Sequence, residues 1–248
     1  MDSRRYGYRM SDVGQSPRQV KLLAVSDQVD PRIHSGSLRQ RMPDIDIVFG
    51  CGDVPARYLE FLADALDRPV YFVLGNHHEE LTRKGIYGKR YDPMGCIDVG
   101  GKIHRDAHTG LLIGGFPGSP KYSRETDQQY SNTEVRRMMC KMIPALLWNR
   151  VRYGRFIDVL ISHAPPRDIN DRDDIPHRGF PSLRSFLRWF QPVVHLHGHI
   201  HIYDRNEAVE TTYHHSTVIN VYPFTQVELA VHRHARADRI ISSGNHHG

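Results

Sequence analysis

VHLHGHIH, the stretch at residues 194–201, begins as an apolar strand and ends in a glycine turn flanked by histidines. Gly198 lets the backbone bend directly before His199 and His201. Because imidazole is the commonest metal ligand among side chains, this turn offers two metal-binding nitrogens at the end of one strand. Histidine clusters also occur on solvated loops, so the stretch by itself leaves a metal site and a solvated loop equally open.

Four further apolar runs of strand length end in side chains that can bind a metal. They are residues 22–27 (LLAVSD), 47–53 (IVFGCGD), 70–78 (VYFVLGNHH) and 157–166 (IDVLISHAPP). Each of these side chains could instead have a structural role without a metal. Asp27 or Asp53 could cap a helix. Asn76 could occupy a turn, and His163 could be a satisfied, half-buried histidine. Taken together, five such strand ends favour one shared metal site over repeated coincidence.

The rest of the pattern is that of an α/β protein. Apolar residues at helical spacing predict a helix over 57–66, after the proline at position 55. Strand, acid, helix and strand in this order indicate a right-handed βα crossover, and such folds bind ligands beyond the carboxyl ends of their strands. Every candidate ligand falls there. The other predicted elements are a helix over 132–153 that is kinked or split at Pro144, a helix over 182–190, a polar loop over 117–130, and strands over 111–116, 217–221 and 226–231.

The 248 residues are enough for one domain with a large core. Residues 1–19 are polar and aperiodic, and we expect them to form a flexible arm. Residues 20–232 would form the domain, and residues 233–248 a C-terminal tail that is partly ordered.

Composition sets limits on location and partners. The chain has 33 basic and 28 acidic residues, and this net charge of +5 favours anionic ligands only weakly. No run of about 18 apolar residues exists, so no membrane span and no membrane partner are expected. The N-terminus lacks the apolar segment of a secretory signal. The three cysteines are odd in number and lack metal-pair spacing, which is typical of reduced cysteines in a cytoplasmic protein.

The order Asp, Gly-Asp, Gly-Asn-His, Ser-His-Ala-Pro, Gly-His-x-His over about residues 20–232 resembles the calcineurin-like metallophosphoesterase family. The resemblance implies a single domain folded as a four-layer α/β/β/α sandwich of two mixed β-sheets flanked by helices. It also implies two divalent metal ions and a catalytic histidine, His77, near the scissile phosphate. The implied ligands are Asp53 as the bridge, Asp27 and His201 on the first metal, and Asn76, His163 and His199 on the second.

Two positions depart from the family pattern. Val29 stands where the family has a histidine ligand, and valine cannot coordinate, so the first metal is expected to be weaker, differently ligated or absent. Asp30 could substitute, although a shift of one residue along a strand usually reverses the facing of a side chain. His78 stands where the family often has an acid that orients the preceding histidine, a role that Glu79 or Glu80 could take over.

The implied ligand set suits phosphate ester hydrolysis. Carboxylate, amide and imidazole ligands fit Mn, Fe, Zn or Ni without choosing among them. Two such ions can activate a water as hydroxide and clamp the phosphoryl oxygens, so no protein nucleophile is required. The chain accordingly has no Gly-x-Ser-x-Gly elbow and no P-loop. His77 could protonate the leaving oxygen, and the alternative for it is a structural turn histidine.

The main prediction is therefore a cytoplasmic, metal-dependent phosphoesterase that hydrolyses a phosphodiester of a phosphorylated small molecule or nucleotide. The alternatives within the family are a phosphomonoesterase and a nuclease, although no further nucleic-acid-binding module is visible. Val29 favours a third alternative, a degenerate member that binds a phosphorylated ligand or a protein without turnover. For substrate contacts, Tyr122 could stack on a base, and Lys121 or Arg124 could pair with a phosphate. The sequence does not indicate an oligomeric state.

Overall fold

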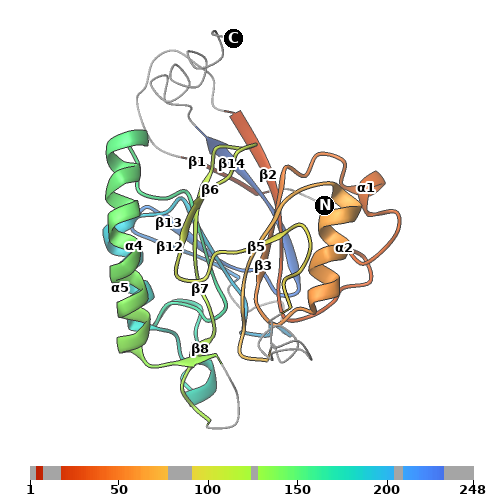
Figure 1. The fold of residues 1–248 in the computed structure, drawn as a ribbon. Helices are drawn as coiled ribbons and strands as arrows, with labels where there is room; N and C mark the ends of the chain where they lie inside the picture. Colours follow the sequence, from red (N-terminus) through yellow and green to blue (C-terminus); the bar gives the residue numbers. More distant parts are fainter. Residues whose placement is uncertain (1–3, 8–17, 78–90, 124–127, 204–208, 232–248) are drawn as a thin grey trace.

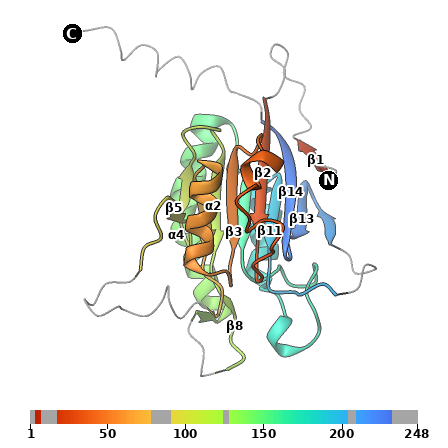
Figure 2. The same cartoon turned by 90° about the vertical axis from the view of Figure 1, so that its right-hand side faces the viewer.

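The computed structural model describes residues 4–7, 18–77, 91–123, 128–203 and 209–231. Two six-stranded mixed sheets pack face to face, with helices covering both outer faces (Figures 1 and 2). The helices are α1 (Leu38–Arg41) and α2 (Ala56–Leu66) on one side, and α4 (Asn132–Tyr153) and α5 (Pro181–Phe190) on the other, with a short 3₁₀ helix η1 (Ile175–His177). This arrangement confirms the predicted four-layer sandwich in a single domain. Among the described residues, no helix combines the length and the apolar character needed to cross a membrane.

The first sheet carries three of the predicted ligand-bearing strand ends. Its strands, in spatial order, are β1 (Arg4–Gly7), β14 (Phe224–Val231), β2 (Arg18–Val25), β3 (Ile47–Cys51), β4 (Val70–Val73) and β5 (Cys96–Asp98). Strands β2, β3, β4 and β5 run parallel, and β14 pairs with β2 in the antiparallel direction. The carboxyl ends of the three central strands therefore lie together at one edge.

The second sheet carries the remaining two strand ends. Its strands, in spatial order, are β12 (Glu210–Tyr213), β13 (Ser216–Asn220), β11 (Val194–His197), β10 (Val159–Ser162), β7 (Leu112–Phe116) and β6 (Ile103–Arg105). The central strands β13, β11, β10 and β7 are parallel. A small separate sheet pairs β8 (Ser119–Pro120) with β9 (Gln129–Tyr130), inside the region predicted to be only a polar loop.

Both faces of each large sheet are buried, which explains why the strands read as continuous apolar runs. Along β2, Leu22 and Ala24 join the core between the sheets, whereas Leu23 and Val25 join the core beneath α1 and α2. This alternation is the period of two that a strand imposes on its side chains. A third cluster fills the space between the second sheet and helices α4 and α5.

Helix α4 begins and ends where the sequence predicts, but it is not split. Ser131 and Glu134 form a capping box at its start, and Gly154 closes it in the left-handed conformation. The helix runs unbroken through Pro144. Pro144 is on the exposed face, so the one backbone hydrogen bond that proline cannot donate is lost on the solvent side, where water can replace it.

The predicted flexible arm over residues 1–19 is partly wrong. Residues 4–7 form strand β1, which pairs in parallel with β14, and residues 18 and 19 already belong to β2. An edge strand pairs through backbone groups and needs no apolar pattern of its own, so its polar sequence carried no signal. The predicted tail over 233–248 lies outside the described residues, and the boundaries of the domain stay a prediction.

Candidate metal centre

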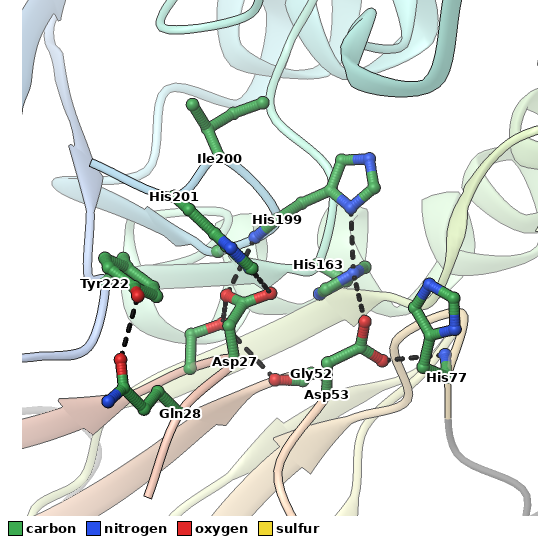
Figure 3. A network of polar contacts seen from close by, with 12 residues as sticks. Asp27, Gln28, Gly52, Asp53, His77, His163, His199, Ile200, His201 and Tyr222 are labelled. Carbon is green, nitrogen blue, oxygen red and sulfur yellow. Dashed lines mark hydrogen bonds and ion pairs between the residues drawn. The ribbon is translucent and has the colours of Figure 1, made fainter. Parts of the chain in front are cut away.

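The predicted site residues meet at the seam where the carboxyl ends of the two sheets face each other (Figure 3). The first sheet contributes the residues after β2, β3 and β4, and the second sheet contributes those after β10 and β11. Side chains that are far apart in the sequence are thereby brought within contact distance. The residues concerned are Asp27, Asp53, Asn76 and His77 from the first sheet, and His163, His199 and His201 from the second.

His163 lies at the middle of this arrangement. Its ring is fully buried, and Nε2 lies 3.0 Å from Oδ1 of Asn76, 3.2 Å from Oδ2 of Asp53 and 3.1 Å from Nδ1 of His199. On the other side of the ring, Nδ1 lies 3.0 Å from the carbonyl oxygen of Cys51. A hydrogen bond there fixes the ring and presents Nε2 to the site, as is usual for metal-ligating histidines.

His199 is held in the same manner. Its Nε2 lies 2.8 Å from the carbonyl oxygen of Pro176, so Nδ1 is the ring nitrogen that faces His163. Sequence reasoning missed this support from the segment around η1. The four atoms around the centre are thus one carboxylate oxygen, one amide oxygen and two imidazole nitrogens.

Asp27 and Asp53 complete a compact group with His163. Each of the three offers a ligand atom, and these atoms all lie within 4.8 Å of one another. Oδ2 of Asp27 accepts hydrogen bonds from the His199 backbone N–H at 2.9 Å and the Ser26 hydroxyl at 2.5 Å. Oδ1 of Asp53 accepts from the backbone N–H of His77 at 2.8 Å. Each carboxylate is therefore held by one oxygen while its other oxygen faces the predicted ligands.

The backbone around the site is arranged for close approach. Asp27, Asp53 and His199 have φ values of 62°, 51° and 68°, in the left-handed region that costs a non-glycine residue about 1 kcal/mol or more. A Cβ on Gly75 would lie 2.0 Å from Oδ1 of Asp53, and one on Gly198 would lie 1.7 Å from the Ser26 hydroxyl oxygen. Only glycine lets these turns reach the carboxylates.

The charges of the site call for a cation. Burial alone would lower the pKa of His163, but the charge of Asp53, a hydrogen bond to it and the charge of Asp27 raise that pKa to about 9. Burial and the neighbouring positive charge of His163 lower the pKa of His199 to about 3. Burial opposes ionisation of Asp27, but His201, His163 and Ser26 outweigh it and lower its pKa. Without a metal, a proton on His163 therefore balances the carboxylates.

This donor set fits divalent transition metals. Mixed oxygen and imidazole ligands suit Mn, Fe, Zn or Ni, and a divalent ion would take over the positive charge that His163 otherwise supplies. The fit rests on His163, Asp53, Asn76 and His199 around one position and on Asp27 beside it. The number and identity of the ions stay predictions.

The side of the site next to Asp27 has fewer donors. His201 is 44% exposed, and its Nε2 lies 3.5 Å from Oδ1 of Asp27, which raises the pKa of His201. Val29 is half-buried and packs against the apolar cluster beneath the first sheet. Asp30 binds Arg32 through both carboxylate oxygens, at 2.9 and 2.6 Å. Asp30 is thus engaged by a cation of the protein, and the structure offers no support for it as a substitute ligand.

Three residues around His201 were not predicted. Its ring stacks on Tyr222 with the centroids 4.7 Å apart and an interplanar angle of 16°, and its Nδ1 lies 3.1 Å from the Tyr203 hydroxyl. Tyr222 in turn donates a hydrogen bond to Oε1 of Gln28 at 2.8 Å. Tyr222 follows the end of β13, so the rule that located the ligands, a polar side chain after an apolar strand, could have located it as well.

The loop that begins after β7 supports a predicted ligand, and its predicted substrate contacts stay predictions. The Tyr122 hydroxyl accepts a hydrogen bond from Nδ2 of Asn76 at 3.0 Å, which orients the Asn76 amide so that Oδ1 faces His163. Lys121, predicted as a phosphate contact, pairs with Glu134 at 3.0 Å. Arg124, His78, Glu79 and Glu80 lie outside the described residues.

Comparisons with known proteins agree with this architecture. The family model of the calcineurin-like phosphoesterases matches residues 11–203. One solved structure aligns with a TM-score of 0.56 and 14% identity, over 82% of this chain and 91% of its own. The crystal structure of TT1561 of Thermus thermophilus aligns with a TM-score of 0.52 and 13% identity, over 84% of this chain and 89% of its own. At such identities the likeness shows the fold alone. No curated protein sequence matches the chain.

Proposed function

Because the chain belongs to the calcineurin-like phosphoesterase family, and is thus a metal-dependent phosphoesterase, we propose that it hydrolyses phosphodiesters at a two-metal site along the seam. The observation that carries this proposal is the position of Asp53. Its Oδ2 lies 3.2 Å from Nε2 of His163, and ligand atoms of Asp27, Asp53 and His163 all lie within 4.8 Å of one another. A carboxylate that is close both to His163 and to Asp27 suits a bridge between two ions.

Each proposed ion would take ligands from both sheets. The second ion would be held by Asn76, His163 and His199 together with Asp53, and the first by Asp27 and His201 with Asp53. Bound divalent ions would supply Lewis-acid activation of water and neutralise the charge of the phosphate. The protein would contribute a rigid arrangement of the ligands, because nearly every proposed ligand is also held by a backbone or side-chain hydrogen bond.

His77 is the proposed proton donor to the leaving oxygen. Its backbone N–H binds Oδ1 of Asp53 at 2.8 Å, and its side chain is exposed at the rim of the site (Figure 3). Its backbone is anchored to the proposed bridging carboxylate, so the exposed ring lies where it could contact a substrate bound at the metals. The ring would hold a proton at one nitrogen and pass it to the departing ester oxygen.

Support for a nucleotide substrate comes from the rim beside His201. Tyr203 is 79% exposed and lies 6.2 Å from the ring of Tyr222. Exposed aromatic rings next to a phosphate site can stack on a base. The scarcity of donors beside Asp27, where Val29 is apolar and Asp30 is bound to Arg32, favours the second candidate function, a member that binds a phosphorylated ligand without turnover.

A metal-resolved activity screen tests the proposal. Metal-stripped protein without an affinity tag is reloaded with Mn, Fe, Zn or Ni, and each form is given a phosphomonoester, a phosphodiester and a cyclic nucleotide. We expect the phosphodiester or cyclic nucleotide to be hydrolysed fastest. His77→Ala serves as the diagnostic variant and is expected to keep its metal while losing about 10²–10⁴-fold in rate.

Each other result has a distinct meaning. Preference for the phosphomonoester would correct the substrate class. Metal binding without turnover of any ester would support the second candidate function instead. Loss of metal from a folded His77→Ala protein would show that His77 is a ligand and that the division of roles is wrong.

A further inference from the structure

Helix α4 has two apolar faces, although only one of them meets the core. Its buried residues are Val135, Met139, Met142, Leu146 and Asn149. At 3.6 residues per turn, Pro144, Leu147, Trp148 and Val151 form a stripe about 100° wide on the opposite side. Leu147 is 52% exposed, Trp148 65% and Val151 82%. We call these four residues the outer stripe. It faces away from the sheets because the opposite face of α4 is the buried one, and α4 lies in an outer layer of the molecule (Figure 1).

Both tryptophans of the chain belong to this helical layer. Besides Trp148 on α4, Trp189 on α5 is 56% exposed. Tryptophan is normally among the more deeply buried side chains, so two exposed tryptophans on one layer indicate a surface that is covered in use.

Cations border the outer stripe on both sides. By the helical spacing, Arg136 and Arg150 lie along one flank and Lys141 and Arg152 along the other, while Arg137 lies in line with the stripe, two turns before Pro144. The sole acid of α4, Glu134, is already paired with Lys121 at 3.0 Å and bound to Ser131. The stripe therefore combines an apolar centre with a positively charged border. A surface that binds it should offer an apolar region bordered by negatively charged groups.

The positively charged border makes a second copy of the chain an unsuitable partner for the outer stripe. Two outer stripes packed together would bring arginine and lysine against arginine and lysine, in a protein of net charge +5, and such like-charge contacts disfavour association. An acidic protein would need a groove to receive the side chains that project from this helix. A lipid headgroup layer adapts to a projecting helix and supplies phosphates along both flanks.

We propose that α4 docks on a membrane surface that contains anionic phospholipids, with Leu147, Trp148 and Val151 entering the headgroup layer. Tryptophan and flanking cations are the usual anchors of a helix that lies in this interface. The sequence indicated no membrane partner because no segment is long and apolar enough to span a bilayer. A helix that lies flat on the surface needs no such length, so the two observations are compatible.

Vesicle binding of the full-length protein tests the proposal. We expect the protein to sediment with phosphatidylcholine vesicles that contain phosphatidylserine, and not with vesicles of phosphatidylcholine alone. Arg137→Gln and Lys141→Gln should each weaken binding about fivefold, and Trp148→Ser should weaken it by at least tenfold. Matched controls are Arg39→Gln on α1 and Met94→Ser, a methionine that is 81% exposed elsewhere on the surface.

Fluorescence places the helix directly. In Trp189→Phe, Trp148 is the sole tryptophan, and its emission should shift to shorter wavelength with phosphatidylserine vesicles. Absence of binding to these vesicles, or equal binding by the stripe variants and their controls, would overturn the proposal. A lipid-free dimer that Trp148→Ser dissociates would also overturn it, because the outer stripe would then be a contact between copies. Thermal unfolding of each variant confirms that the fold is intact.

Discussion

Loading the metal-stripped protein with a divalent ion should expel a proton from His163. The charges of Asp53 and Asp27 outweigh burial and raise the pKa of His163 to about 9. A histidine can bind a metal only when the coordinating nitrogen is deprotonated. Because Nε2 of His163 faces Asn76, Asp53 and His199, the proton and the metal compete for the same position.

The size of the effect follows from that pKa. At pH 7, about two units below the pKa, roughly 99% of His163 carries the proton, so binding should release about one proton per ion. Apparent affinity should then rise about tenfold per pH unit from roughly pH 7 to 9 and level off above that range. His199 adds nothing here, because its pKa of about 3 leaves it neutral throughout.

Isothermal titration calorimetry with Mn²⁺ or Zn²⁺ measures the released proton. Titrations in buffers of different ionisation enthalpy give the number of protons from the slope of the observed heat. His199→Gln is the matched control, since it removes a proposed ligand but keeps His163 and should keep the proton release. Affinity that is independent of pH between 7 and 9, with no proton released, would refute the electrostatic account of the site.

The same proton should be visible in the stability of the metal-free protein. The pKa of His163 is higher in the folded chain, at about 9, than its ordinary value of 6.5. Its stabilising contribution is therefore complete below about pH 6.5 and is lost as the pH rises through about 9. The loss amounts to about 3 kcal/mol of unfolding free energy. Chemical denaturation of metal-free protein at several pH values measures it, and an unchanged unfolding free energy would contradict the prediction.

Three substitutions test the roles of single residues. Asp53→Asn should abolish activity and lower metal content more than any other single ligand change, since its charge serves both proposed ions; full occupancy with near-normal turnover would contradict this. Tyr122→Phe should weaken metal binding or activity about tenfold, because it removes the hydrogen bond that orients the Asn76 amide, and wild-type metal affinity would show that the amide needs no such support. Val29→His should tighten binding of a second equivalent of Mn²⁺, because it supplies the imidazole that the first site lacks. Unchanged affinity would show that the side chain at this position stays among its apolar neighbours.

The meeting of the site residues could be predicted because it depends on local pattern, whereas the four layers of the fold were predicted from the resemblance to the family. Each strand is an apolar run, and the parallel order of β2, β3 and β4 brings the residues after them to one edge whatever the details of the loops. The ligand roles and the cytoplasmic location stay predictions. The contacts that orient the ligands could not be read in this manner. Tyr122 is 46 residues from Asn76, and no periodicity links them.

The environment of Val29 and Asp30 could not be predicted from the sequence either. Whether Asp30 could replace a missing ligand depended on its competing partner, and Arg32 is two residues away on the same loop. A short-range ion pair of this kind is compatible with several backbone paths, and only the path decides whether the carboxylate turns toward the metals or away from them.

The division of the site between two sheets bears on how the protein acquires its metal during synthesis. Asn76, the last proposed ligand of the first sheet, precedes His163 by 87 residues. At roughly 5–20 residues per second, a ribosome would expose the oxygen donors about 4–17 seconds before the first proposed imidazole ligand. Carboxylates and an amide alone favour hard ions such as Mg²⁺ or Ca²⁺. If the proposed ligands hold the metal, selection of a transition metal would have to wait until the second sheet has docked on the first, so the finished fold, rather than the emerging chain, would choose the ion.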